Sequence, residues 1–419
     1  MKKYLQLFNI NLFIKLTLLI FLILFFITVP YDVSFIPNLA KPLQPLLVKI
    51  NSYIAVHFFN TGSTRSPHLV SDSVLLYTHV FLLIFISCII SFVLIISNTI
   101  KQNQLFYSLL LNKTASYFIG LHLLNYGFSK IFKTQFYLPE PNTLFTTIGQ
   151  TPKDLLYWST IGVSRSYNIF LGICECIAAL LLLFKRTNLI GACLTFTILI
   201  NVLAINLCYD ISVKLFSGVL LFYTTVVISY YKNILKIVFM AYNNKHILKP
   251  KPTIKKYAII FNTLLVGYFI LCTSYPYIKN NNFNDDNATR PPLHGAYETF
   301  YFAINNEPQI PLITDTSIWR RLFFHRQGYF IAQYMTDAMQ DYNLQIDTTT
   351  KKLFITNTTN SSSNSSTNSN ENYFNYINQG DTILILNGTL GSDSILLKAK
   401  KLNLNTLPVL QKEFNATVD

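Results

Sequence analysis

Long apolar stretches separated by short polar segments fill the first two thirds of the chain. A hydrocarbon core about 30 Å thick requires about 20 apolar residues of helix to cross it. Lipid offers no hydrogen-bond partner to an open strand, so such stretches should be helical. The pattern predicts an all-α membrane bundle of about seven transmembrane helices. The predicted spans are Leu12–Val29, Val74–Ser97, Ser116–Phe132, Ser164–Phe184, Thr187–Asn206, Val213–Tyr230 and Tyr257–Leu271.

The pattern changes after the last span. A polar tether, Asn280–Asn287, is followed from Leu293 by short runs in which apolar and polar residues alternate, as in strands with one buried face. Gly380 and Gly391 lie between the last runs, where hairpin turns are expected. These features predict a C-terminal antiparallel β-barrel or meander. Examples of the runs are Tyr297–Ile304, Tyr329–Tyr334, Leu353–Thr356, Tyr373–Ile377, Thr382–Leu386 and Ser394–Ala399.

These patterns predict three domains. Residues 1–114 would form an N-terminal transmembrane helix pair with an exported loop, and residues 115–274 a helical bundle with the last transmembrane helix. Residues 290–419 would form an exported β-domain, with the Ser- and Asn-rich tract 357–372 as a hairpin tip.

Charge indicates how the helices are oriented. From Tyr275 onward the chain has 11 Lys and Arg against 13 Asp and Glu, a net charge of −2; the rest has 22 against 6, a net charge of +16. The lysines lie between the spans, where they report topology rather than nucleic-acid binding. The positive-inside rule then places the N-terminus in the cytoplasm, the chain in the inner membrane, and the C-terminal domain outside. We expect the first span to be an uncleaved anchor; the alternative is a cleaved signal peptide.

One acidic residue, Glu175, lies near the middle of the fourth span. It is about 11 residues into that span, which places it roughly 16 Å deep. A lone carboxylate there is costly and is expected to be protonated or paired. His122 and Asn125 of the third span lie at similar depth and are the predicted partners. The three are candidate catalytic residues; the alternative is that Glu175 only locks two helices together through Asn125.

A second polar group is expected at the exported ends of the helices. Lys214 is four residues from Asp210, so the two could pair on one helix face if the sixth helix begins at Asp210. The group forms either an outward-facing basic pocket for an anionic substrate or a quinone head group, or a helix cap with two snorkelling side chains. The candidate substrate-binding residues are Lys130, Arg165, Asn206, Asp210 and Lys214.

Several short motifs follow one another in an order that is more specific than any one of them. They are Asn125–Lys130, Gln135–Phe136, Leu155–Trp158, Tyr167–Gly172, Glu175, Phe184–Thr187, Asn201–Val202, Asn206–Asp210 and Val213–Leu215. The set resembles the DoxX family of small membrane proteins, in a long form with an N-terminal helix pair and an exported C-terminal domain. The resemblance covers about Tyr117–Tyr230 and implies a four-helix core. It also implies an association with sulfur-compound oxidation or quinone-linked redox chemistry.

Three function classes fit the sequence. The first is a redox enzyme or subunit of the membrane that exchanges electrons with quinone; it would need a partner subunit or a diffusible quinone, since no haem, flavin or paired-thiol motif is apparent. The second is an envelope binding or assembly protein whose bundle anchors the β-domain. The third is a proton-coupled transporter that uses Glu175 as a relay. The sequence has no metal-ligand spacing of His and Cys.

Overall fold

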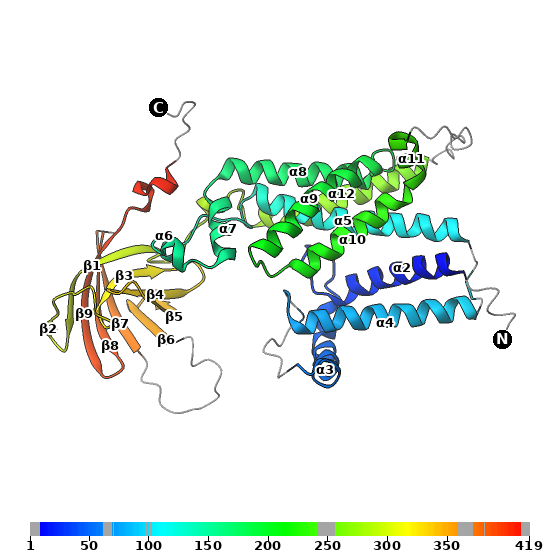
Figure 1. Ribbon diagram of the computed structural model, residues 1–419. Helices are drawn as coiled ribbons and strands as arrows, with labels where there is room; N and C mark the ends of the chain where they lie inside the picture. The colour runs from blue at the N-terminus through cyan, green and yellow to red at the C-terminus, as the bar shows by residue number, and fades with distance from the viewer. Residues whose placement is uncertain are drawn as a thin grey trace. The chain divides into compact units, whose positions relative to one another are not determined.

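The computed structural model describes residues 9–61, 69, 71–97, 99–100, 103–240, 256–357, 372–380 and 382–411 (Figure 1). Its contacts divide the chain into a helical unit, Met1–Gln135 with Arg165–Asp285, and a β unit, Phe136–Ser164 with Asp286–Asp419. The N-terminal lysines, most lysines between α10 and α12, and the Ser- and Asn-rich tract at 358–371 lie outside the described residues. The predicted three-domain division stays a prediction.

All seven predicted spans fall on helices of the helical unit. Five of its described helices, α2, α4, α8, α9 and α12, are long and apolar enough to cross a membrane. Helix α10 is apolar but shorter, and α5 carries more polar residues. The protein is a multi-pass membrane protein. The helices are α2 (Ile10–Thr28), α3 (Ala40–Phe59), α4 (Val74–Ile96), α5 (Gln104–Ile131), α8 (Arg165–Leu183), α9 (Asn188–Cys208), α10 (Lys214–Tyr230), α11 (Lys232–Met240) and α12 (Lys256–Lys279).

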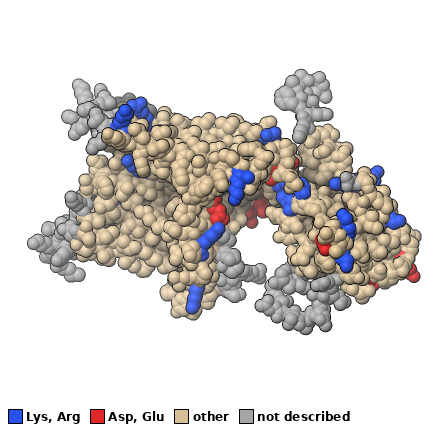
Figure 2. Space-filling model, turned by 180° about the vertical axis from the view of Figure 1, so that it is seen from behind, with Lys and Arg blue, Asp and Glu red and all other residues tan. Residues whose placement is uncertain are grey.

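Apolar side chains lie on the outside of the helical unit as well as inside it. Phe81, Phe170 and Leu264 are more than half exposed, on α4, α8 and α12. On the face drawn in Figure 2, the helical unit has a broad area without charged side chains. Exposing so much apolar surface to water would cost free energy. These helices are therefore in contact with the lipid bilayer.

One long helix of the helical unit was not predicted. Helix α3 lies in the segment assigned to an exported loop, and it runs across the direction of α2 and α4 (Figure 1). Asn51 of α3 is completely buried, and its amide nitrogen lies 3.1 Å from Nδ1 of His79 on α4. Nε2 of His79 lies 2.8 Å from the hydroxyl of Thr28. A buried chain of polar contacts therefore joins α2, α3 and α4.

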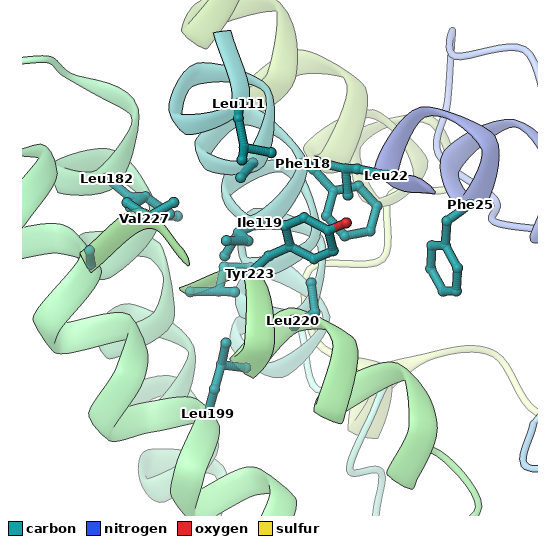
Figure 3. Close-up of a cluster of buried hydrophobic side chains, with 14 of the residues drawn as sticks. Leu22, Phe25, Leu111, Phe118, Ile119, Leu182, Leu199, Leu220, Tyr223 and Val227 are labelled. Atoms are coloured by element: carbon teal, nitrogen blue, oxygen red, sulfur yellow. The ribbon is translucent and has the colours of Figure 1, made fainter. Parts of the chain in front are cut away.

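The core of the helical unit joins α2 to the later helices. In Figure 3, Leu22 and Phe25 of α2 share one cluster with Phe118 of α5 and Tyr223 of α10. The Tyr223 ring is fully buried, and its hydroxyl donates to the carbonyl of Leu18 at 2.7 Å. The buried phenol therefore has the hydrogen-bond partner it needs in an apolar environment.

Helices α5 and α8 approach each other through facing glycines. A Cβ on Gly172 would lie 2.5 Å from the carbonyl oxygen of Gly127, and a Cβ on Gly127 would lie 2.6 Å from Sγ of Cys176. Farther along the same interface, Gly120 lies against Leu183. Small residues let helix backbones come close in membranes. Side chains three residues beyond each glycine therefore meet between the two helices.

The β unit is an antiparallel barrel, which confirms the predicted fold class. Eight described strands follow one another in order, and β9 pairs with β1 to close the barrel. The two-residue strand β2 pairs only with β1. Gly380 and Gly391 have φ angles of 58° and 64° in the turns after β7 and β8, as predicted. The strands are β1 (Gly295–Ile304), β2 (Glu307–Pro308), β3 (Trp319–Phe324), β4 (Tyr329–Tyr334), β5 (Met339–Asp347), β6 (Lys352–Asn357), β7 (Asn372–Gln379), β8 (Ile383–Leu390) and β9 (Asp393–Lys401).

Large side chains fill the barrel. Trp319 is buried between Phe330, at 5.4 Å between ring centroids, and Phe374, at 5.9 Å. Leu384 and Leu397 are completely buried in the same cluster. An eight-stranded barrel is just wide enough for its side chains to fill it. The interior is a hydrophobic core.

The segment between α5 and α8 belongs to the β unit. It holds two short helices, α6 (Pro141–Leu144) and α7 (Lys153–Gly162). Glu140, just before α6, is buried and binds His294 before β1 and Arg326 in the β3–β4 turn. These contacts fix the interhelical segment to the barrel.

Candidate functional site

A buried ion pair lies between α5 and α8. Nζ of Lys130 lies 2.9 Å from Oε1 and 2.8 Å from Oε2 of Glu175, and the side chains are 9% and 8% exposed. Lys130 lies three residues beyond Gly127, and Glu175 lies three residues beyond the facing glycine, Gly172. Each side chain leans toward the start of its own helix. Because the helices are antiparallel, the two side chains converge.

The prediction that Glu175 pairs with His122 or Asn125 was wrong. The structure pairs Glu175 with Lys130 instead of His122 or Asn125. The prediction compared depths of Cα atoms, but the long lysine side chain reaches back along α5 from near its end. Lys130 therefore does not extend toward the lipid head groups, as the snorkelling alternative required.

His122 and Asn125 line a pocket of about 240 Å³ in the helical unit. His122 is 4% exposed. The centroid of its ring lies 4.7 Å from the ring centroid of Phe118, 5.0 Å from that of Phe216 and 6.3 Å from that of Tyr31. The pocket lies between α5, the start of α10, and the segments that follow α2 and precede α4. Its other described lining residues are Val29, Pro30, Asp32, Val33, Leu69, Ser71, Asp72, Leu76, Tyr126 and Val213.

Tyr126 connects this pocket, named here the membrane pocket, to the ion pair. Its side chain lines the pocket, and its ring centroid lies 5.6 Å from Nζ of Lys130. A cation at this distance from an aromatic ring is attracted to it. The ion pair therefore lies behind Tyr126, which forms part of the pocket wall. A change in the pair would alter that part of the wall.

The charged side chains that line the membrane pocket are carboxylates paired with lysines, whereas the predicted pocket was basic. The charged lining residues, among those described, are Asp32 and Asp72. Asp72 accepts hydrogen bonds from the backbone nitrogens of Lys214, at 2.8 Å, and Leu215, at 3.0 Å. A carboxylate at the start of α10 satisfies free N–H groups and interacts favourably with the helix dipole.

The predicted pairing of Lys214 with Asp210 is confirmed, at 2.7 Å between Nζ and Oδ1, although α10 begins at Lys214. Nζ of Lys214 also lies 3.7 Å from Asp72. Asn206 is buried and donates to the hydroxyl of Ser217 at 3.0 Å, while Arg165 is exposed at the start of α8. The five predicted substrate-binding residues are therefore not gathered in one pocket.

Sequence reasoning missed Asp72 and Tyr126 as pocket residues and Lys130 as the partner of Glu175. One feature of the sequence could have pointed to these residues, namely that acidic residues are scarce in the helical part of the chain. The chain has only six before Tyr275. Two line the membrane pocket, one forms the buried ion pair, and one pairs with Lys214. The remaining two, Glu140 and Asp154, line a cavity in the β unit.

The side chains of the membrane pocket offer hydrogen bonding rather than metal binding. Over the described ranges, no three His, Cys, Asp or Glu side chains lie close enough together to hold a metal ion. The pocket combines an imidazole, a carboxamide, two phenols and two carboxylates with aromatic walls. Such a site suits a small, partly apolar molecule with polar groups at its edge.

Comparison with known proteins gives one partial similarity. Over 104 residues, 25% of this chain, the sequence is 33% identical to the uncharacterized protein YwoB of Bacillus subtilis (strain 168). The matched region covers 66% of YwoB, slightly less than two thirds of that protein's length. No known protein family and no solved structure matches the chain. The resemblance to the DoxX family stays a prediction.

Proposed function

We propose that the helical unit binds a quinone head group in the membrane pocket and that the protein serves as a membrane redox subunit. The observation that carries this proposal is the pocket itself: about 240 Å³, with His122 and Asn125 beside aromatic walls. A volume of this size, small for a ligand site, suits a single ring. The resemblance of Tyr117–Tyr230 to the DoxX family supports the same class of chemistry.

The residues would act on the head group as hydrogen-bonding and enclosing groups. A ring N–H of His122 and the amide of Asn125 would donate to the quinone oxygens. Phe216 and Tyr31, packed on His122, would exclude water from the head group. The Lys130–Glu175 pair would hold α5 against α8 and keep Tyr126 in position. Electrons would come from a partner redox protein, and the bilayer would supply the quinone.

We also propose a cytoplasmic N-terminus and an exported β unit, in the inner membrane. The basic segments between alternate spans support this orientation.

The second candidate is an envelope binding or assembly protein anchored by its helices. The filled barrel favours it, because a closed β module with a hydrophobic core can present binding surfaces without chemistry of its own. The proton-coupled transporter is less favoured, since Glu175 is engaged by Lys130 rather than available as a lone relay.

Quinone retention tests the first proposal. The chain is purified in mild detergent, extracted with organic solvent and assayed for quinone by chromatography. We expect up to about one quinone per chain. His122→Phe keeps a ring but loses the N–H groups. A lost hydrogen bond is worth about 1 kcal/mol, so retention should fall by roughly fivefold to tenfold.

Phe170→Leu, on the exposed surface of α8, is the matched control and should retain quinone like the wild type. Equal retention by the wild type and His122→Phe would contradict the proposal. Wild-type protein that carries no more quinone than an unrelated membrane protein from the same cells would favour the anchored binding module.

A further inference from the structure

The β unit holds a second cavity, of about 350 Å³, outside the membrane pocket. The interhelical segment forms most of it, and His325 of the β3–β4 turn completes it. This volume is within the range of small-molecule sites. The residues on which the argument rests are Tyr137, Glu140, Asn142, Asp154 and Trp158.

Glu140 is fully engaged in holding this cavity together. Its carboxylate is 4% exposed, lies 3.2 Å from Nε2 of His294, and accepts from Nε of Arg326 and, at 3.3 Å, from the Arg326 backbone N–H. Burial alone would raise its pKa, but the His294 hydrogen bond and the charges of Arg326 and His325 lower the pKa to about 2. Glu140 is an ionised structural group at neutral pH.

Two other acceptors on the cavity wall have no partner. The side-chain oxygen of Asn142 is buried and receives no hydrogen bond in the described structure. Asp154, in the first turn of α7, is exposed and has neither a hydrogen bond nor an ion pair with another described residue. A buried acceptor without a donor costs free energy. The wall therefore offers the cavity two oxygen acceptors that no described side chain engages.

Aromatic rings lie beside these acceptors. Tyr137 already carries the Arg326 guanidinium at 4.2 Å from its ring centroid, so its face accepts a cation. Trp158 is partly buried, and its ring centroid lies 4.9 Å from that of Phe136, which fixes the indole plane. Indole is the aromatic group that attracts cations most strongly.

We propose that this cavity binds a small organic ammonium group. Its N–H groups donate to the Asp154 carboxylate and to the Asn142 side-chain oxygen, and its charge lies against Trp158. An anion is disfavoured because the Asp154 carboxylate lines the cavity without an ion-pair partner among the described residues. The same chemistry occurs in free amines and in the ethanolamine head group of a lipid. This inference does not depend on the quinone proposal.

Trp158 provides a direct reporter. The chain has two tryptophans, and the other, Trp319, is buried in the barrel core. In a Trp319→Phe background, emission from full-length protein therefore comes from Trp158 alone. Ethanolammonium chloride is titrated against this protein in nanodiscs of phosphatidylglycerol. We expect a saturable change in emission, and none with glucose or acetate.

Asp154→Asn should weaken the affinity for ethanolammonium about fivefold, since an ion pair with an exposed carboxylate contributes up to about 1 kcal/mol. Asp393→Asn, at the start of β9, is the matched control and should bind normally. Equilibrium dialysis of labelled ethanolamine against the unmodified chain gives the same comparison if Trp319→Phe misfolds.

Nanodiscs that contain phosphatidylethanolamine distinguish the two sources of the amine. If the ligand is a lipid head group, the emission will already have shifted before ethanolammonium is added. If it is a free amine, the titration will be unchanged. Saturation by glucose instead, equal affinity in Asp154→Asn, or no saturable binding would overturn the proposal.

Discussion

Replacing Lys130 with methionine is expected to lower the free energy of unfolding of the helical unit by about 3–5 kcal/mol, because it leaves a buried carboxylate without its partner. Glu175→Leu should also destabilise, since it leaves the Lys130 ammonium unpaired. The double variant Lys130→Met/Glu175→Leu removes both charges. It should recover to within about 1–2 kcal/mol of the wild type, as replaced buried ion pairs often do. Reversible unfolding in mixed micelles measures all four proteins of the cycle.

Lys41→Met is the matched control for this cycle. Lys41 pairs with Asp32 at 3.2 Å, but the two side chains are 68% and 81% exposed. An exposed pair contributes about 0–1 kcal/mol. If Lys130→Met were as mild as Lys41→Met, or if the two buried substitutions were simply additive, the ion pair would not have the role assigned to it.

Glu140→Gln is expected to destabilise the β unit by about 3 kcal/mol at neutral pH, because a pKa lowered from 4.5 to about 2 corresponds to that free energy. A carboxyl whose folded pKa lies below its unfolded value stabilises the fold above the unfolded pKa. That contribution is lost as the pH falls through the folded pKa. The wild type should therefore lose stability between about pH 4.5 and pH 2. Glu140→Gln should lack this part of the profile.

Urea unfolding of the full chain in a Trp158→Phe background, followed by Trp319 emission in the barrel, measures this difference at each pH. Glu298→Gln is the control, since Glu298 pairs with Arg321 at 3.3 Å but is 48% exposed. It should cost at most about 1 kcal/mol. The difference in unfolding free energy between the wild type and Glu140→Gln should shrink toward pH 2. A difference that stays constant from neutral pH to pH 2 would contradict the lowered pKa.

The sequence predicted the elements with strong periodicity. The spans that became α2, α4, α8, α9 and α12 are long and apolar, and six alternating runs became strands. Helix α3 was missed because Lys41, Pro42 and Gln44 interrupt its apolar pattern. Strand β5 was missed because most of its side chains are polar and only Tyr342 is fully buried.

The candidate site was less predictable because it depends on contacts between distant segments. Depth along a span placed His122 and Asn125 correctly on one helix, but it could not show that Lys130 reaches Glu175. The partner of Asp72 lies 142 residues away in the chain. Glu140 meets Arg326 across 186 residues. No local pattern contains such pairs, whereas the scarcity of acidic residues before Tyr275 did indicate where to look.

Helices α5 and α8 hold an ionised Lys130–Glu175 pair behind the membrane pocket. Infrared difference spectroscopy of the wild type against Glu175→Gln, in lipid at neutral pH, tests this pairing most directly. The substitution should remove carboxylate stretching bands and leave the protonated-carboxyl region unchanged. Loss of a protonated-carboxyl band instead would show that Glu175 is neutral and would contradict the ion pair.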